Sequence, residues 1–232
     1  MNTDLARRAT AEAVGTAMLL AAVVGSGIMG ERLAGGNVAI ALLANTVATG
    51  AALVALILTF GPVSGAHFNP AVTIADATLG GIAWREVPVY IAAQIAGAFT
   101  GVATADLMFG LPIFFASHHE RSGPAQWFAE AVATFSLVLT ILGGLRYAAQ
   151  SIPWLVGLVI TAAYWFTSST SFANPAVTLA RGFTTTFAGI AINHVPGFIA
   201  AQIVGALVAA LLAAVLFPTL NERWGEATDS GQ

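Results

Sequence analysis

Long apolar stretches, separated by short polar or glycine-containing segments, dominate the chain. Six of them reach the length of about 20 mostly apolar residues that a helix needs to cross a bilayer. Their predicted bounds are roughly 9–30, 38–60, 84–109, 125–145, 152–169 and 195–217. Leucine and alanine are frequent in these stretches, and no ten-residue segments of alternating polarity occur. The pattern therefore favours transmembrane helices over the strands of a transmembrane barrel.

The first stretch follows Arg7 and Arg8, which raises the alternative of a cleaved signal peptide. Its apolar run is too long for such a peptide, it contains Glu12, and no small-residue cleavage site follows it. We therefore expect the first stretch to remain as a transmembrane helix.

Composition agrees with a membrane protein and excludes several functions. Charged residues make up 8% of the 232 residues and hydrophobic residues 57%, whereas an average soluble domain carries about 25% charged residues. All eight basic residues are arginine, and the net charge is −3, so no basic surface for nucleic acid is expected. The chain has no cysteine, which excludes thiol catalysis and cysteine-ligated metals. No nucleophile–base pair or cluster of metal ligands appears, so we expect no enzyme activity, no metal and no cofactor.

The arginines predict the orientation, because six spans place both chain ends on one side. That side would carry Arg7, Arg8, Arg85, Arg146 and Arg223. The opposite side would carry Arg32, Arg121 and Arg181. Since cytoplasmic loops carry an excess of basic residues, we expect a multi-pass protein of the inner (plasma) membrane with both termini in the cytoplasm. Residues 218–232 would form a polar cytoplasmic tail.

Two pentapeptides recur in the same order at nearly the same separation. Asn-Pro-Ala-Val-Thr occupies 69–73 and recurs 105 residues later at 174–178. Ile-Ala-Ala-Gln-Ile occupies 91–95 and recurs 108 residues later at 199–203. The chain is therefore interpreted as a duplication within one membrane domain, 1–232, with repeats of about 9–110 and 125–217. Each repeat has three spans, so the second enters the membrane from the opposite side, and a functional site is expected near the midplane.

Each Asn-Pro-Ala copy predicts a helix start inside a segment too short to cross the membrane. Asn is a favoured N-cap and Pro a favoured first helical residue. The predicted helices, 69–78 and 174–183, would be about 15 Å long, which is half a bilayer. An ordinary Asn-Pro turn is the alternative for one copy, but two copies in register favour half-helices. Inversion would bring their positive N-termini together and disfavour cations there.

The segment 64–73, Ser-Gly-Ala-His-Phe-Asn-Pro-Ala-Val-Thr, resembles the first signature of the aquaporin, or major intrinsic protein, family. Asn174, Pro175 and Ala176 resemble the second signature of the same family. The likeness covers about residues 9–217 and extends to the aquaglyceroporin-like members. It implies an all-α membrane protein with six transmembrane helices and two re-entrant half-helices in an inverted 3+3 repeat. It also implies one pore per subunit, and a homotetramer.

The resemblance also assigns roles to single residues. It implies that the pore passes the two motifs, Asn69, Pro70, Ala71, Asn174, Pro175 and Ala176. Glu12 and Glu130 match buried glutamates of the family, for which we expect a structural role in anchoring backbone amides of the re-entrant loops. His67 matches a pore-lining position.

The selectivity filter departs from the usual family pattern. In most aquaporins an arginine stands three residues after the second Asn, whereas this chain has Val177 there and an arginine only at Arg181. Spacing from the motifs predicts a filter made of Thr49, Ala162, Ser171 and Val177. A one-residue gap would move the second of these to Thr161 or Ala163.

This uncharged filter without an aromatic side chain predicts a wide constriction that passes neutral solutes larger than water, such as glycerol-like polyols. The alternative is that other side chains fill the gap. Arg181, four residues after Val177 on the same helix face, would then lie about one turn outward at the mouth. The pattern is similar to bacterial aquaporins found with arsenic-resistance genes, which implies permeation by neutral metalloids such as arsenite and by methylated arsenicals.

A second functional hypothesis is a proton-coupled secondary transporter, which can also contain inverted repeats and half-helices. It would use Glu12, Glu130 or Asp106, because ionisable residues inside spans often relay protons. The twin Asn-Pro-Ala motifs favour a passive channel. The loop segment His118–His119–Glu120 is interpreted as solvated rather than metal-binding, and Gly97 and Gly101 predict close contact between helices.

Overall fold

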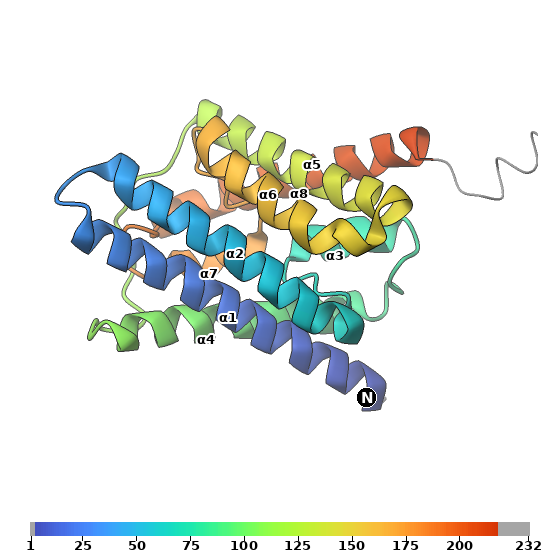
Figure 1. Ribbon diagram of the computed structural model, residues 1–232, viewed down its shortest axis with the longest axis horizontal. Coiled ribbons are helices and arrows are strands. Elements are labelled where there is room, and N and C mark those ends of the chain that lie inside the picture. Colours follow the sequence, from blue (N-terminus) through green and yellow to red (C-terminus); the bar gives the residue numbers. More distant parts are fainter. Residues whose placement is uncertain (1–2, 218–232) are drawn as a thin grey trace, which may run out of the picture.

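The computed structural model describes residues 3–217, and this part of the chain contains eight α-helices and no strand. The long helices are α1 (Thr3–Leu33), α2 (Val38–Ser64), α4 (Val87–Met108), α5 (Pro124–Tyr147), α6 (Ile152–Phe166) and α8 (Val195–Leu216). The short helices are α3 (Pro70–Thr78) and α7 (Pro175–Arg181), and two 3-10 turns cover Ala149–Ser151 and Ile192–His194. The predicted all-α fold with six spans and two half-helices is confirmed (Figure 1). The predicted tail 218–232 lies outside the described residues.

The helix bounds differ from the predicted bounds at several ends, and most at the start of the first helix. The first helix begins at Thr3 rather than at residue 9, because Asp4, Arg7 and Arg8 pair along the first two turns and support a polar extension. The fifth long helix ends at Phe166, since Thr167 is extended (φ −110°, ψ 139°). The second half-helix ends at Arg181 rather than at 183.

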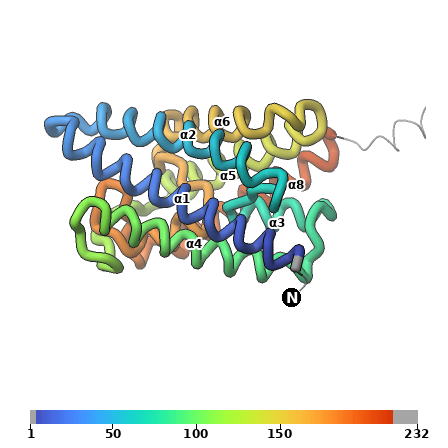
Figure 2. Tube along the Cα trace, turned by 60° about the horizontal axis from the view of Figure 1, so that its bottom comes forward, coloured from blue at the N-terminus to red at the C-terminus, as the bar shows by residue number. Residues whose placement is uncertain are grey.

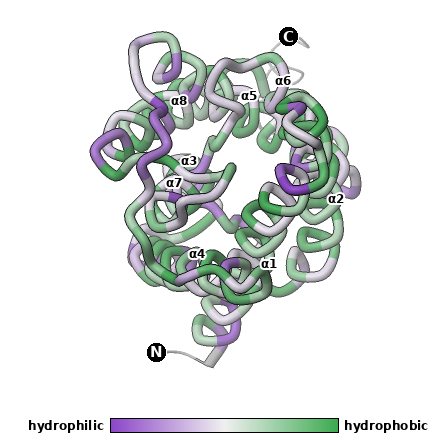
Figure 3. The backbone as a smooth tube through the Cα atoms, turned by 90° about the vertical axis from the view of Figure 1, so that its left-hand side faces the viewer, coloured by the Kyte–Doolittle hydropathy of each residue, from purple (hydrophilic) through white to green (hydrophobic). Residues whose placement is uncertain are grey.

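The two halves of the chain pack in the same way. Helix α1 contacts α2 and α4, α5 contacts α6 and α8, and the α2–α6 contact joins the halves. Figure 2 shows α1 running beside α2 and α4. Seen end-on, the long helices surround α3 and α7 (Figure 3). The half-helices start near the centre and run to opposite ends of the molecule (Figure 1).

Small residues bring the long helices into backbone contact within each half. A Cβ atom built on Gly97 of α4 would overlap the carbonyl oxygen of Ala13 in α1. A Cβ atom built on Gly205 of α8 would overlap the carbonyl oxygen of Ala131 in α5 in the same way. Such close approach maximises van der Waals contact, which drives helix association where lipid removes the hydrophobic driving force.

Gly97→Ala and Gly205→Ala are each expected to destabilise the protein by about 1–3 kcal/mol, because the added methyl group forces two helix backbones apart. The matched control is Gly25→Ala in α1, where the new Cβ meets only a Phe109 ring carbon at 3.4 Å. Thermal unfolding of the detergent-purified variants measures the effect. Equal melting temperatures for Gly97→Ala and Gly25→Ala would contradict the close-approach argument.

Candidate functional site

The two Asn-Pro-Ala motifs form the inner ends of the half-helices. The Asn69 side-chain oxygen accepts a hydrogen bond from the Ala71 amide at 2.9 Å, and Asn174 caps Ala176 at 3.0 Å. In both copies the proline follows the N-cap directly, where its missing N–H costs no helical hydrogen bond. The sequence signature therefore produces two short helices that start near the centre of the molecule (Figure 1).

The two asparagines also join the two halves of the chain. Asn69 Nδ2 donates to the Ala173 carbonyl at 2.7 Å, and Asn174 Nδ2 donates to the Phe68 carbonyl at 2.7 Å. A side-chain amide nitrogen has two hydrogens, so one N–H of each asparagine remains for a solute. Both asparagines line the central cavity.

Two buried glutamates hold the loops that lead into the half-helices. Glu12 accepts hydrogen bonds from the amides of His67 and Phe68 at 3.0 and 2.7 Å. Glu130 accepts from the amides of Phe172 and Ala173, both at 2.9 Å. These are the contacts that the expected anchoring role requires.

A glutamine and a threonine extend each glutamate to its half-helix. Gln94 Nε2 donates to Glu12 Oε2 at 2.8 Å and to Thr73 Oγ1 at 3.0 Å. Gln202 Nε2 makes the equivalent bonds to Glu130 Oε2 and to Thr178 Oγ1 at 2.6 and 2.7 Å. Because the glutamates, glutamines and threonines are buried, these networks fix the half-helices against the surrounding helices.

A cavity of about 340 Å³ runs along the half-helices and past both asparagines. At one end, here called the Asp76 end, it is lined by Arg8, His67 and Asp76. At the other, here called the Arg181 end, it is lined by Ser171, Phe172, Val177 and Arg181. Apolar side chains cover much of the wall between these ends, including Val23, Leu53, Val72, Leu137 and Val156. The wall therefore combines a few polar groups with a large apolar surface.

Three of the four predicted filter residues line this cavity: Thr49, Ser171 and Val177. The prediction that Ala162 belongs to the wall is wrong, because Ala162 is exposed on the outside of α6 and is not in the lining. Ile160 and Tyr164 line the cavity instead. A helix turns about 100° per residue, so residue 162 lies nearly opposite residues 160 and 164. The alternatives Thr161 and Ala163 are not lining residues either.

Tyr164 is a wall residue that the spacing argument missed. Its hydroxyl donates to Thr49 Oγ1 at 3.3 Å and links α6 to α2 beside the cavity. The signal for this face of α6 is the four-residue spacing of Val156, Ile160 and Tyr164, which are all buried.

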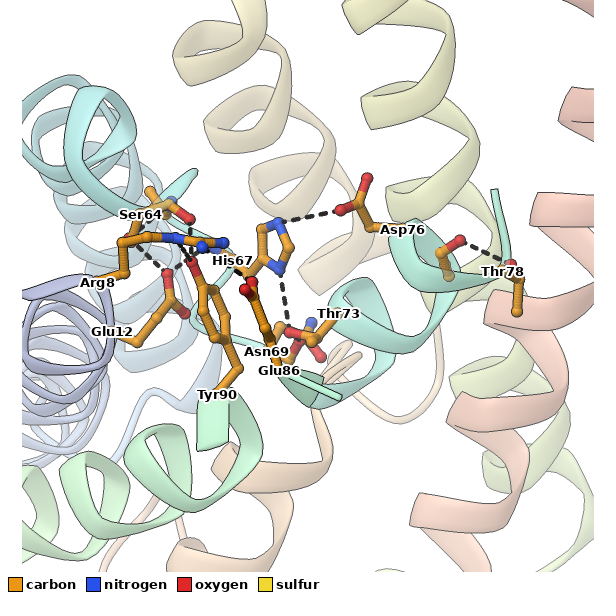
Figure 4. A network of polar contacts seen from close by, with 12 residues as sticks. Arg8, Glu12, Ser64, His67, Asn69, Thr73, Asp76, Thr78, Glu86 and Tyr90 are labelled. Carbon is orange, nitrogen blue, oxygen red and sulfur yellow. Dashed lines mark hydrogen bonds and ion pairs between the residues drawn. The ribbon is translucent and has the colours of Figure 1, made fainter. Parts of the chain in front are cut away.

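Polar side chains gather at the Asp76 end (Figure 4). His67 Nδ1 lies 3.1 Å from Thr73 Oγ1, and its Nε2 lies 3.7 Å from an Asp76 carboxylate oxygen. Arg8 pairs with Glu86 at 2.8 Å and donates from Nε to the Tyr90 hydroxyl at 2.8 Å. This end of the cavity therefore contains charges of both signs.

The Arg181 end carries two buried arginines. Arg181 donates from Nε to the Ala188 carbonyl, and its Cζ lies 3.4 Å from the centre of the Phe172 ring. Arg121, from the loop before α5, donates to the carbonyls of Gly189 and Phe187 at 2.9 and 3.2 Å. The sequence left open whether Arg181 reaches the pore, and the structure places it in the cavity wall. Arg181 therefore adds a positive charge to this end of the cavity, next to the predicted filter residues Ser171 and Val177.

The His119 imidazole adds little positive charge to this end at neutral pH. Burial, with the nearby guanidinium groups of Arg121 and Arg181, holds the pKa of the His119 imidazole below its ordinary value. Glu120 pairs with His194 at 3.4 Å. Within residues 3–217, no three His, Cys, Asp or Glu side chains form a group that could hold a metal ion.

Comparison with known proteins identifies relatives of this chain. Residues 1–151 match the family described as major intrinsic protein. The chain is 57% identical to aquaglyceroporin AqpS of Rhizobium meliloti (strain 1021), over 90% of this chain and 89% of that protein. It is 39% identical to the glycerol uptake facilitator protein of Bacillus subtilis (strain 168), over 44% of this chain and 42% of that protein.

A solved structure has the same fold. The X-ray structure of the aquaglyceroporin from Plasmodium falciparum is similar with a TM-score of 0.75 over 94% of this chain and 99% of that chain. Sequence identity is 22%, so this likeness supports the arrangement of the helices.

Proposed function

Because this chain belongs to the major intrinsic protein family, we propose that its cavity is a passive channel for glycerol-like polyols, water and other small uncharged solutes. The chain is a multi-pass membrane protein of a channel family and not an enzyme. The observation that carries the proposal is the continuous cavity that passes both capped asparagines.

The cavity wall suits a solute with hydroxyl groups on one side and carbon on the other. Asn69 and Asn174 each keep one N–H to donate, and Thr49 and Ser171 add hydroxyls. The opposing apolar side chains match a carbon backbone, which is the general composition of small-molecule sites.

The proposal extends to neutral metalloids. Undissociated arsenite carries three hydroxyl groups on one centre and so offers hydrogen bonds similar to those of glycerol. Val177 at the position of the usual filter arginine supports a wall that leaves room for such solutes, and the same reasoning includes methylated arsenicals.

Assembly and orientation complete the proposal. We expect a homotetramer in the inner membrane with both termini in the cytoplasm. Large apolar side chains on the outer surface, such as Phe128, Leu211 and Val215, are more than 70% exposed in the single chain, which suits contact with lipid or with neighbouring subunits.

The contacts of the glutamates argue against proton-coupled transport. Neither Glu12 nor Glu130 lines the cavity, and both carboxylates accept hydrogen bonds from backbone amides. Proton-coupled transport needs a titratable group that reaches the solute path, whereas passive conduction needs no such group.

Flux measurements on proteoliposomes test the proposal. Stopped-flow light scattering with water, glycerol, urea and arsenite should show flux above protein-free liposomes that stops at equal concentrations. The rates should not respond to a pH gradient. Accumulation against a gradient, or dependence on a proton gradient, would favour the transporter. Flux no higher than that of protein-free liposomes for every solute would overturn the channel.

A further inference from the structure

The Arg181 guanidinium lies in the cavity wall without a carboxylate partner. The ion pairs among residues 3–217 do not include Arg181. Arg181 is 3% exposed. The charged groups that act on it electrostatically are Arg121 and Glu130, and Glu130 is held by backbone amides. A buried cation normally has a partner of opposite charge, so its absence here needs an explanation.

The orientation of the Arg181 guanidinium is fixed, but most of its N–H donors have no hydrogen-bond partner among the described residues. One of its five N–H groups, on Nε, donates to the Ala188 carbonyl, and the planar group stacks on Phe172. No other hydrogen bond of the Arg181 side chain occurs among the described residues. Four N–H groups on the two terminal nitrogens therefore remain for a ligand in the cavity.

Ser171 provides a second, independent observation at the same place. Its Oγ is buried and has no hydrogen-bond partner in the described part of the chain, although the residue lines the cavity and is 2% exposed. Ser171 directly precedes Phe172, the residue on which Arg181 stacks. An unpartnered buried hydroxyl is costly, and a solute oxygen in the cavity would satisfy it.

Arg121 adds a second positive charge close to Arg181. Arg121 Cζ lies 5.3 Å from the same Phe172 ring. Its side-chain hydrogen bonds go to two carbonyls and to the Thr170 hydroxyl. Within residues 3–217, neither arginine of the Arg181 end has an ion-pair partner, whereas the opposite end contains both Arg8 and the Asp76 carboxylate.

We propose that Arg181 and Ser171 form a binding subsite for small monoanions that carry two oxygens on one atom, such as simple carboxylates. Two parallel N–H donors of a guanidinium match the two oxygens of a carboxylate, and the serine hydroxyl adds a third donor. The inference rests on the proposed function, because a bound anion acts by occupying the solute path. A small carboxylate therefore slows the passage of neutral solutes.

Inhibition of glycerol flux tests the subsite. Proteoliposomes at pH 7.5 are measured with acetate, with acetamide as its neutral isostere, and with chloride at the same ionic strength. We expect acetate to inhibit, and the two controls to have little effect. Arg181→Gln should raise the acetate concentration for half-inhibition by roughly tenfold, because it removes a charge-assisted pair. Ser171→Ala should raise it by a smaller factor.

Arg32→Gln is the matched control, since Arg32 is exposed, contacts the Phe109 carbonyl and is not in the cavity lining. This variant should keep the wild-type response to acetate. Equal inhibition by acetate and chloride, or equal responses of Arg181→Gln and Arg32→Gln, would overturn the subsite. Should Arg181→Gln fail to conduct glycerol, an unchanged acetate response of Ser171→Ala would overturn it instead.

Saturation-transfer NMR of acetate with the detergent-solubilised protein separates the two proposals. A signal in the wild type that Arg181→Gln abolishes supports the subsite even where proteoliposomes conduct no solute. Glycerol flux without any acetate signal overturns the subsite and leaves the channel intact.

Discussion

Val177→Arg is expected to reduce glycerol flux about tenfold and water flux much less, which corresponds to about 1.4 kcal/mol in the barrier for glycerol. Val177 lies in the cavity wall with Thr49 and Ser171. A long arginine side chain at this position adds bulk to the cavity wall. It also places a second guanidinium one helical turn from Arg181, and together the two side chains leave less room for a polyol than for water. Stopped-flow measurements of both solutes on the same liposome preparation give the flux ratio.

Val177→Met is the matched control for bulk without charge. We expect it to lower glycerol flux less than Val177→Arg does, because methionine is flexible and can turn aside. An unchanged ratio of glycerol to water flux in Val177→Arg would remove residue 177 from the filter.

Glu130→Ala is expected to prevent recovery of a folded channel. The carboxylate accepts hydrogen bonds from the Phe172 and Ala173 amides and from Gln202 Nε2. Its removal leaves three buried donors without their acceptor, each at a cost of about 1–3 kcal/mol. The sum is comparable to the total stability of about 5–15 kcal/mol of a typical protein. Size-exclusion profiles and melting temperatures in detergent measure the loss, and Glu12→Ala should behave in the same way.

Two further variants sharpen this experiment. Glu120→Ala is the control, because the Glu120 side chain is 79% exposed and, within residues 3–217, pairs only with His194. Its melting temperature should match the wild type. Glu130→Gln keeps one carbonyl oxygen as acceptor and should be less destabilised than Glu130→Ala. Where Glu130→Gln folds, it should still conduct glycerol, and a selective loss of flux would revive the proton-relay hypothesis. A melting temperature of Glu130→Ala equal to that of the wild type would contradict the anchoring role.

The motif residues could be predicted from the sequence because their information is local. Asn69 and Asn174 cap helices within two residues of themselves, and the recurrence of the motif reveals the inverted repeat. The glutamates could be placed only through the family resemblance. Each glutamate lies more than 40 residues along the sequence from the amides that donate to its carboxylate. No local pattern encodes such a pairing.

The predicted filter residues were placed by counting residues from the two motifs. Counting from the motifs predicted Thr49, Ser171 and Val177, and all three line the cavity. The count failed at Ala162, because an error of two residues rotates a side chain by about 200° around the helix. Burial of Ile160 and Tyr164 is decided by which face of α6 meets α2 and α5.

The sequence by itself therefore determined the six spans, the two half-helices and the place where they meet, since span length, caps and repeats are properties of neighbouring residues. Only the tertiary structure decided that the cavity wall carries a guanidinium. Arg181 is oriented by the Phe172 ring and the Ala188 carbonyl. One of these residues precedes Arg181 in the sequence and the other follows it, and the fold brings both next to its side chain. The position of a long, flexible side chain depends on these contacts and not on its count from a motif.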